Sequence, residues 1–308
     1  MSRVVVLKGG RSLERQVSLA SGGRVQDALE RLGHEVHGLD AGHDLVAQLR
    51  ALAPEVVFVA LHGRDGEDGT VQGLLELLEI PYTGSGVSAC TRCSDKAQAK
   101  HLLRAAGLPT PGFFAFSEAA FKELGAGDAL PELGQRLGYP LVVKPVDQGS
   151  ALGLKVAPDA GAVPAALVAA FSYADRVLLE AHVAGADLSV SVLGDEPLPV
   201  VQAIPREGED GYSARYTIGS TSFACPADIG TEATARVQEL ALAVHGLLGC
   251  RDFSRVDLLL GPDGPMVIDV DVAPGMTETS LLPQAAEAAG IGFDALVERM
   301  LAPALARG

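Results

Sequence analysis

The clearest alternation of apolar and polar residues lies near the carboxyl-terminal end of the chain, on both sides of the sequence Gly261-Pro-Asp-Gly264. Two alternating runs joined by a short turn of this composition predict a β-hairpin. One face of the hairpin is apolar and comprises Val256, Leu258, Leu260, Met266, Ile268 and Val270. Because successive side chains of a strand point to opposite faces, we expect this set to be buried against a core.

The opposite face of the hairpin carries Arg255, Asp257, Asp269 and Asp271. A turn centred near Asp263 would pair Asp257 with Asp269 and Arg255 with Asp271 across the two strands. Facing carboxylates repel unless a cation lies between them, and three of them suit Mg²⁺ or Mn²⁺. The alternative is a solvated acidic hairpin, which leaves unexplained why the hairpin runs directly into Pro274-Gly275. We therefore predict a metal site on this face.

The first third of the chain alternates between short apolar runs and helical patterns. We expect strands at residues 4–7, 35–39 and 56–61, and helices at 16–31 and 44–52. This order predicts a parallel α/β sheet, in which ligands bind beyond the carboxyl ends of the strands. Polar clusters fall there, at residues 8–19 with Glu14 and at 62–69 with His62. Taken singly, Glu14 is also explained by the first turn of a helix, and His62 by a loop hydrogen bond.

The middle of the chain has features that are typical of phosphate binding. A strand ends near Lys144 and is followed by the glycine-rich sequence Gln148-Gly-Ser-Ala-Leu-Gly153. The backbone N–H groups of such a loop can lie over phosphates, and lysine supplies a point charge. Glu180 and Asp187 could accept hydrogen bonds from an adenine or a ribose, although two acids at strand ends are an equally good interpretation. The long polar stretch at residues 207–223 is of the kind that forms lids.

Length and charge narrow the classes of function. The 308 residues correspond to one to three domains, and 24 basic against 39 acidic residues give a net charge of −15. This charge argues against nucleic acid or an anionic membrane as a partner, and no apolar run is long enough for a membrane helix. ATP is not excluded, since one phosphate site needs only a few local cations.

The four cysteines are not spaced as a disulfide framework or a zinc site, and the amino terminus lacks a signal-peptide pattern. We therefore expect a cytoplasmic, reducing setting.

Eight short sequences occur along the chain in a fixed order. They are Gly9-Gly-Arg-Ser-Leu-Glu14-Arg-Gln-Val-Ser18, His62-Gly-Arg-Asp-Gly-Glu-Asp-Gly-Thr-Val-Gln-Gly73, Ile80-Pro-Tyr-Thr-Gly84, Asp95-Lys96, Val143-Lys144-Pro145, Gly149-Ser150, Arg255-Val-Asp257 and Pro274-Gly-Met-Thr277. In this order the chain resembles, over nearly its whole length, the D-alanine–D-alanine ligases of the ATP-grasp superfamily. The resemblance implies an α/β and α+β fold: a parallel α/β domain at residues 1–94, then α+β domains at 95–182 and 183–308 whose antiparallel sheets sandwich ATP.

The resemblance also implies a reaction and a role for each candidate residue. ATP would phosphorylate the carboxylate of a first D-alanine, and the amine of a second would attack the acyl phosphate, giving D-alanyl-D-alanine for peptidoglycan. The nucleotide would be bound by Lys96, Lys144, Gly149, Ser150, Glu180, Asp187 and Arg215. Two Mg²⁺ or Mn²⁺ ions would be held by Asp257, Asp269 and Asp271. The reacting groups would be contacted by Glu14, Ser150, Tyr216, Arg255 and Gly275, and the amino-acid substrates by His62, Ser280 and Leu281. A homodimer is the implied assembly.

Some positions depart from the family pattern. Asp269-Val-Asp271 stands where Glu-x-Asn is usual, so one carboxylate reaches ~1.5 Å less far and one negative charge is added. Ala151, Ala181, Asp187 and Arg215 also differ, so the departures cluster on the nucleotide and metal side. They leave open a specialised ligase that acts on another amino or hydroxy acid or closes a ring, and a non-catalytic nucleotide-binding protein. A nicotinamide dehydrogenase is disfavoured because the dinucleotide fingerprint is missing.

Overall fold

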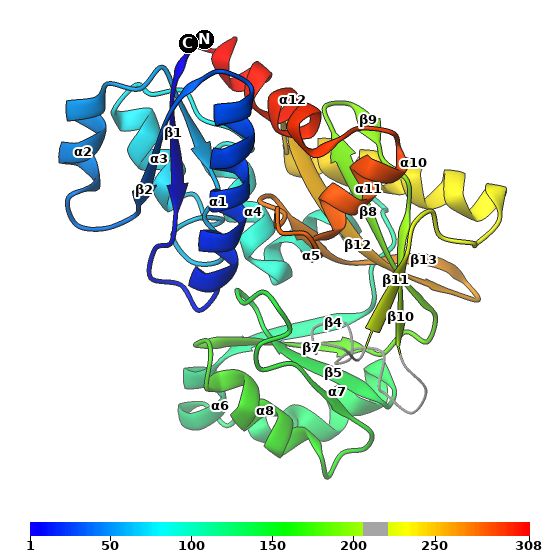
Figure 1. The fold of residues 1–308 in the computed structure, drawn as a ribbon. Coiled ribbons are helices and arrows are strands. Elements are labelled where there is room, and N and C mark those ends of the chain that lie inside the picture. Colours follow the sequence, from blue (N-terminus) through cyan, green and yellow to red (C-terminus); the bar gives the residue numbers. More distant parts are fainter. Residues whose placement is uncertain (206–220) are drawn as a thin grey trace.

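The computed structural model describes residues 1–205 and 221–308, and these residues form three β-sheets with helices packed around them (Figure 1). The described strands are β1 (Arg3–Lys8), β2 (Glu35–Asp40), β3 (Val56–Val59), β4 (Phe113–Ser117), β5 (Leu141–Pro145), β6 (Lys155–Ala157), β7 (Arg176–Ala181), β8 (Ala186–Leu193), β9 (Glu196–Pro197), β10 (Val201–Pro205), β11 (Thr221–Ala224), β12 (Phe253–Gly261) and β13 (Gly264–Asp271). The described helices are α1 (Arg15–Arg31), α2 (Leu45–Leu52), α3 (Thr70–Leu77), α4 (Val87–Ser94), α5 (Lys96–Ala105), α6 (Glu118–Glu123), the 3₁₀ helix η1 (Ala126–Ala129), α7 (Leu130–Leu137), α8 (Val163–Phe171), α10 (Thr231–Leu248), α11 (Leu281–Ala288) and α12 (Phe293–Leu305).

The first sheet has the strand order β2-β1-β3 and is parallel throughout, which confirms the sequence-based prediction. Helices cover both faces of β1. Val4 and Val6 belong to the apolar cluster that includes residues of α1, whereas Val5 and Leu7 belong to the cluster that includes residues of α2 and α3. A central strand buried on both faces must be apolar at every position, and this explains why the strand lacks an alternating pattern. The predicted helix at 16–31 is α1, and the strand predicted at 56–61 already ends at Val59.

The second sheet has the order β4-β7-β5-β6 and is antiparallel. Helix α8 covers one face, where it packs against Leu141, Val143 and Leu179. Because side chains alternate along a strand, Lys144 and Glu180 lie on the opposite face. That face is turned toward the third sheet, since Lys144 Nζ is 3.4 Å from the carbonyl oxygen of a β13 residue. The second sheet therefore presents buried charges to the third.

The third sheet has the order β11-β10-β8-β12-β13, with β9 paired to β8, and is antiparallel. Helix α10 covers one face, where its residue Val244 joins Val190, Val256 and Leu258 in one apolar cluster. The helix ends at Gly249, whose φ of 75° is a left-handed conformation that favours glycine. Helix α5 packs against α10 and β13. With α10 on one face, the other face of this sheet is left for the polar side of the hairpin.

The hairpin formed by β12 and β13 has the predicted pairing at its polar end. Arg255 pairs with Asp271 and Asp257 pairs with Asp269, as the expected turn near Asp263 requires. The prediction that these four side chains share one face is therefore consistent with the register of the strands.

A β-bulge changes the apolar face of the same hairpin. Beyond the polar end the register shifts by one residue, so that Leu258 pairs with Val267. The shift leaves Ile268 as the extra residue of β13 and turns Val267 into the apolar cluster. The prediction that Met266 and Ile268 belong to the buried face was therefore wrong. Ile268 instead lines a cavity together with Leu259.

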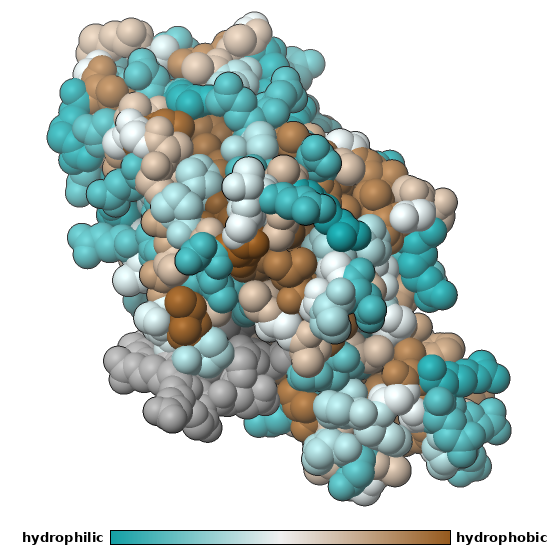
Figure 2. Space-filling view, turned by 90° about the vertical axis from the view of Figure 1, so that its right-hand side faces the viewer, coloured by the Kyte–Doolittle hydropathy of each residue, from teal (hydrophilic) through white to brown (hydrophobic). Residues whose placement is uncertain are grey.

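The last helices return to the first sheet. Helix α12 packs against α1 (Figure 1). Arg31 on α1 donates hydrogen bonds to Asp294 on α12, one of them 2.9 Å long. The three sheets fall within residues 1–94, 95–182 and 183–308; these domain boundaries stay a prediction. Within the described ranges no helix is long and apolar enough to cross a membrane. Figure 2 shows apolar and polar residues interspersed over one face of the molecule.

Candidate active site

Two cavities of the described structure adjoin one another between the sheets. The smaller, of about 390 Å³, lies between the second and third sheets. The larger, of about 1110 Å³, is lined by loops of the first and second sheets, the hairpin and the segment before α11. The residues that line both cavities are Lys96, Gln148, Gly149, Ser150 and Asp269. A ligand in one cavity can therefore touch a ligand in the other at this junction.

The smaller cavity has the composition of a nucleotide site. Lys96 and Lys144 bring two ammonium groups to its wall, and the loop at residues 148–152 adds backbone N–H groups. Leu259 and Ile268 offer an apolar surface to a flat ring, and Asp187 adds a carboxylate. The bulge in β13 thus contributes directly to this wall, because it places Ile268 there.

Glu180 lies next to this cavity and not among the residues that line it. Its carboxylate is fully buried, and Oε2 is 2.9 Å from Lys100 Nζ and 3.3 Å from Lys144 Nζ. Burial raises the pKa of Glu180, but the two lysines outweigh this effect and hold the pKa below its ordinary value. The carboxylate is therefore ionised. Of the two acids expected at the nucleotide, the structure brings Asp187 to the cavity and pairs Glu180 with the lysines.

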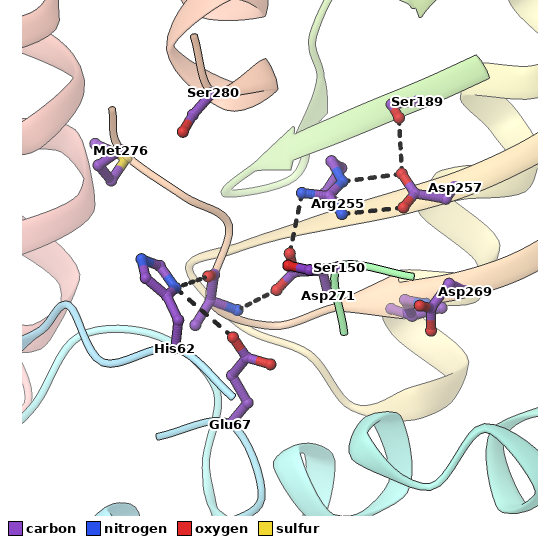
Figure 3. A network of polar contacts seen from close by, with 12 residues as sticks. His62, Glu67, Ser150, Ser189, Arg255, Asp257, Asp269, Asp271, Met276 and Ser280 are labelled. Atoms are coloured by element: carbon purple, nitrogen blue, oxygen red, sulfur yellow. Dashed lines mark hydrogen bonds and ion pairs between the residues drawn. The ribbon is translucent and has the colours of Figure 1, made fainter. Parts of the chain in front are cut away.

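The polar face of the hairpin is built around Arg255 (Figure 3). Its Nε and Nη2 donate to the two carboxylate oxygens of Asp257, at 2.9 and 3.0 Å. Nη1 lies 3.0 Å from Oδ2 of Asp271. Asp257 is buried and also accepts a hydrogen bond of 2.7 Å from Ser189 Oγ on β8. The guanidinium therefore bridges two of the three aspartates.

The third aspartate, Asp269, lies 2.8 Å from Lys96 Nζ. Each aspartate thus contacts a cationic side chain, and within residues 1–205 and 221–308 no group of three His, Cys, Asp or Glu is arranged to hold a metal ion. The donor chemistry nevertheless fits Mg²⁺ or Mn²⁺, because hard carboxylate oxygens from both strands face the cavities. An ion bound here would compete with Lys96 and Arg255 for the same oxygens.

The segment after the hairpin is shaped by Gly275. A Cβ atom there would lie 2.6 Å from Ser280 Oγ, so a larger residue would displace the Ser280 hydroxyl from its present position. Ser280 Oγ accepts a 3.0 Å hydrogen bond from the backbone N–H of Thr277. Helix α11 begins directly afterwards at Leu281, and all four residues line the larger cavity. The first N–H groups of a helix have no partner within the helix, so this corner is suited to a carboxylate.

Glu14 and Ser150 meet although 136 residues separate them. Ser150 Oγ donates a hydrogen bond to Glu14 Oε1. A Cβ atom on Gly149 would lie 3.2 Å from both oxygens of the Glu14 carboxylate, so the glycine lets the loop come close. The pair joins the end of the first sheet to the loop over the smaller cavity, and its carboxylate is available to an ammonium group in the larger cavity.

His62 and Glu67 form a buried pair in the larger cavity (Figure 3). His62 Nδ1 is 2.9 Å from the carbonyl oxygen of Ala273 and 3.6 Å from Glu67 Oε1, and Nε2 is 3.1 Å from Ser21 Oγ. Burial lowers the pKa of His62, but Glu67 and the neighbouring carboxylates have the larger, opposite effect. The pKa of His62 therefore lies above its ordinary value. Burial is also the main reason why the pKa of Glu67 rises to about 7. The pair therefore retains a proton close to neutral pH.

Two of the predicted site residues cannot be placed. Arg215 and Tyr216 lie at residues 206–220, outside the described part of the chain. The other predicted residues line one or both cavities, with the exception of Glu180.

Sequence reasoning missed several residues that contact the site. Glu67 belongs to the predicted polar cluster at 62–69, but only His62 was singled out there. Ser189 lies opposite Asp257 because β8 pairs with β12, and this pairing is known only from the structure. Lys100 follows Lys96 by one helical turn, a spacing that could have indicated a shared face.

Comparison with known proteins shows what this chain is similar to. The family models described as D-ala D-ala ligase N-terminus and D-ala D-ala ligase C-terminus match residues 37–85 and 102–302. The D-alanine–D-alanine ligase of Syntrophotalea carbinolica is 46% identical over 305 residues, which cover 99% of this chain and 97% of that protein. The ligase of Nitrosomonas europaea is 42% identical over 302 residues, covering 98% and 96%. A crystal structure of D-alanine–D-alanine ligase from Bacillus anthracis complexed with ATP has a TM-score of 0.85 and 30% identity, covering 99% of this chain and 98% of that chain.

Proposed function

The chain belongs to the D-alanine–D-alanine ligase family, and from this premise we propose that it joins two D-alanines to D-alanyl-D-alanine for peptidoglycan, with cleavage of ATP. The fold is accordingly ATP-grasp. The observation that carries the proposal is the junction of the two cavities at Lys96, Ser150 and Asp269. At this junction a terminal phosphate from the smaller cavity can reach a carboxylate held in the larger one.

The smaller cavity would bind ATP. Lys96 and Lys144 would neutralise phosphate oxygens, and the loop that includes Gly149 would cover them with N–H donors. Asp187 would accept hydrogen bonds from ribose hydroxyls. The cationic Arg215 is proposed as the lid residue that closes over the phosphates.

The larger cavity would hold the first D-alanine beside the phosphate. Glu14 would bind its ammonium group, and Ser150 would fix the orientation of that carboxylate. After the second amine attacks, negative charge develops on the former carboxylate oxygen. Arg255 and the backbone N–H of Gly275, which line this cavity, would stabilise this oxygen. Tyr216 is proposed to complete the contacts of Glu14 and Ser150.

The second D-alanine would bind with its carboxylate at the start of α11. Ser280 and the free N–H of Leu281 are the proposed donors. Its ammonium group must lose a proton before it can attack the acyl phosphate. The buried pair of His62 and Glu67 lines the same cavity and exchanges a proton near neutral pH, so it is suited to orient and polarise the substrates there.

Asp257, Asp269 and Asp271 are the proposed ligands of one or two Mg²⁺ or Mn²⁺ ions. When bound, such ions supply positive charge that offsets repulsion among phosphate oxygens. Lys96 and Arg255 would then exchange their carboxylate partners for phosphate and substrate oxygens. Through this exchange the same two cations would pair with aspartates in the ligand-free site and contact substrates in the loaded one.

We further propose that the protein acts in the cytoplasm and as a homodimer, as the family resemblance implies. All four cysteines are free thiols, which supports a reducing compartment. Light scattering of the purified protein tests the assembly: a mass near that of one 31.7 kDa chain would contradict the dimer.

Release of ADP tests the proposed reaction. The protein would be incubated with ATP and Mg²⁺ and with a panel of D-amino acids, L-amino acids and D-hydroxy acids, while product masses are measured. We expect ADP and the dipeptide with D-alanine, loss of turnover with a chelator, and recovery when Mg²⁺ or Mn²⁺ is restored. Turnover with another acid only, or a product one water lighter than its substrate, would contradict the D-alanine assignment. ATP binding without ADP release under every condition would contradict catalysis itself.

A further inference from the structure

Lys100 is a buried lysine that lines neither of the two cavities. Its side chain is 2% exposed, and its Nζ is 2.9 Å from Oε2 of Glu180. Nζ also donates a 2.5 Å hydrogen bond to Thr110 Oγ1, which in turn donates to the carbonyl oxygen of Val267 at 2.8 Å. Lys100 therefore ties helix α5 to β7 of the second sheet and to β13 of the third.

The charges around Glu180 do not balance. Lys144 lies 3.3 Å from the same carboxylate oxygen that Lys100 contacts at 2.9 Å, so two ammonium groups share one carboxylate. Burial of a charge is costly unless an opposite charge is close, and the shorter contact belongs to Lys100. With two lysines on one carboxylate, the three groups carry a net charge of +1, and Lys100 has the closer contact with Glu180. The ammonium of Lys144 lines the smaller cavity.

Helix geometry explains how one element serves both parts of the site. Lys96 and Lys100 are four residues apart on α5, so they lie on the same face of the helix. Lys96 reaches Asp269 at the junction of the cavities, and Lys100 reaches Glu180 beside the smaller cavity. The helix therefore delivers one ammonium to the wall of the cavity and a second to the carboxylate that supports it.

We propose that Lys100 is a positioning residue for the nucleotide: it remains the counter-ion of Glu180 when Lys144 exchanges its 3.3 Å contact with that carboxylate for an ATP phosphate. Without Lys100, the buried carboxylate would have only Lys144 to pair with, and the two would form a neutral pair withdrawn from the cavity. The inference rests on the proposed use of ATP in the smaller cavity. It predicts an effect on nucleotide binding that does not extend to the amino-acid substrates.

The test compares Lys100→Met with Lys100→Arg, using the full-length protein. ATP affinity is measured by calorimetry in the absence of amino acids, and KM and kcat are measured from ADP release. We expect Lys100→Met to weaken ATP binding by about tenfold, which equals about 1.4 kcal/mol, and to raise the KM for ATP by a similar factor. The KM for D-alanine and kcat should stay unchanged, and Lys100→Arg should restore most of the affinity. Lys122→Met is the matched control, since it removes the same charge from an exposed lysine on α6.

Equal ATP affinity in the wild type and Lys100→Met would overturn the inference. So would a fall in kcat, or a rise in the KM for D-alanine, without a change in ATP affinity, because these results indicate a general structural role. A wild-type protein that does not bind ATP at all would instead overturn the proposed function. The two failures are therefore distinguishable.

A second comparison keeps the inference testable if Lys100→Met does not fold. Both buried charges are removed in Lys100→Met/Glu180→Gln, which avoids an unpaired buried carboxylate. If Lys100 acts through Glu180, adding Lys100→Met to Glu180→Gln should change ATP affinity by less than about twofold. A further large loss of affinity in the double variant would show that Lys100 acts on the nucleotide by another route.

Discussion

Asp257→Asn is the substitution that most directly tests the hairpin site. The buried carboxylate accepts hydrogen bonds from Arg255 at 2.9 and 3.0 Å and from Ser189 at 2.7 Å. Asparagine keeps one acceptor oxygen, but its NH₂ group would face an N–H donor of Arg255. At least one charge-assisted hydrogen bond is lost, and this costs about 1.5–3 kcal/mol. Arg255 retains Asp271 at 3.0 Å, so the larger penalty for an unpaired buried charge does not apply.

The expected variant is folded and inactive. A loss of about 1.5–3 kcal/mol leaves most domains folded and should lower the melting temperature by about 3–12 °C. Turnover should fall by about 10²-fold or more, because a charge of the proposed metal site is removed and Arg255 is no longer held by two hydrogen bonds to Asp257.

The assay for Asp257→Asn measures ADP release at saturating substrates and thermal unfolding in the same buffer. The matched control is Asp263→Asn, which makes the same chemical change at an exposed position in the turn of the same hairpin; it should keep both the rate and the melting temperature. Turnover of Asp257→Asn within a few-fold of the wild type would show that the carboxylate is not needed at the site. An absent melting transition would show that the stability estimate is wrong.

The remaining predictions concern the larger cavity. Ser150→Ala removes the hydrogen bond to Glu14 and should raise the KM for the first D-alanine by about tenfold; unchanged KM in steady-state assays would contradict the role of the pair. Gly275→Ala places a Cβ atom 2.6 Å from Ser280 Oγ and should lower turnover, whereas Gly292→Ala, with open space around the new Cβ, should have no effect in the same assay. Burial raises the pKa of Glu67 to about 7. Between about pH 5 and 7 the native state therefore binds more protons than the unfolded chain. The contribution of Glu67 to stability falls as pH rises through that window. Glu67→Gln should therefore lessen the fall in melting temperature between about pH 5 and pH 8, and an unchanged pH dependence would contradict this assignment.

The hairpin shows how far the sequence alone determines a site. The pairing of Asp257 with Asp269 follows from the position of the turn and the strict period of two in a strand. The bulge at Ile268 could not be predicted in this way, because residues 265–268 are all apolar and either register buries an apolar side chain. The register of the strands depends on what packs against each face of the sheet. In the fold, α10 packs against one face and the second sheet lies across the cavity from the other.

Contacts between distant segments are the second limit. Glu14 and Ser150 are 136 residues apart, and no local pattern connects them; only the family resemblance placed both of them at the reacting groups. The sequence alone gives no sign that Lys100 differs from other helical lysines. Its burial becomes apparent only in the fold, where Glu180 on β7 contacts it. Patterns of polarity therefore located the elements and the polar clusters, whereas tertiary packing decided which charges are paired.

The sum of charges on the hairpin bears on how ATP would enter. Among the described residues of the hairpin site, three aspartates contact two cations, Arg255 and Lys96, and these five groups sum to a charge of −1. With asparagine at position 271, the residue usual in the resembled pattern, the same groups would balance. The extra charge of Asp271 would repel free ATP and attract a divalent cation, and we expect both effects to favour the entry of ATP as its metal complex over sequential binding of the bare nucleotide. In this way the departure from the family pattern would strengthen the proposed coupling between metal and nucleotide while it leaves carboxylate donors at the site.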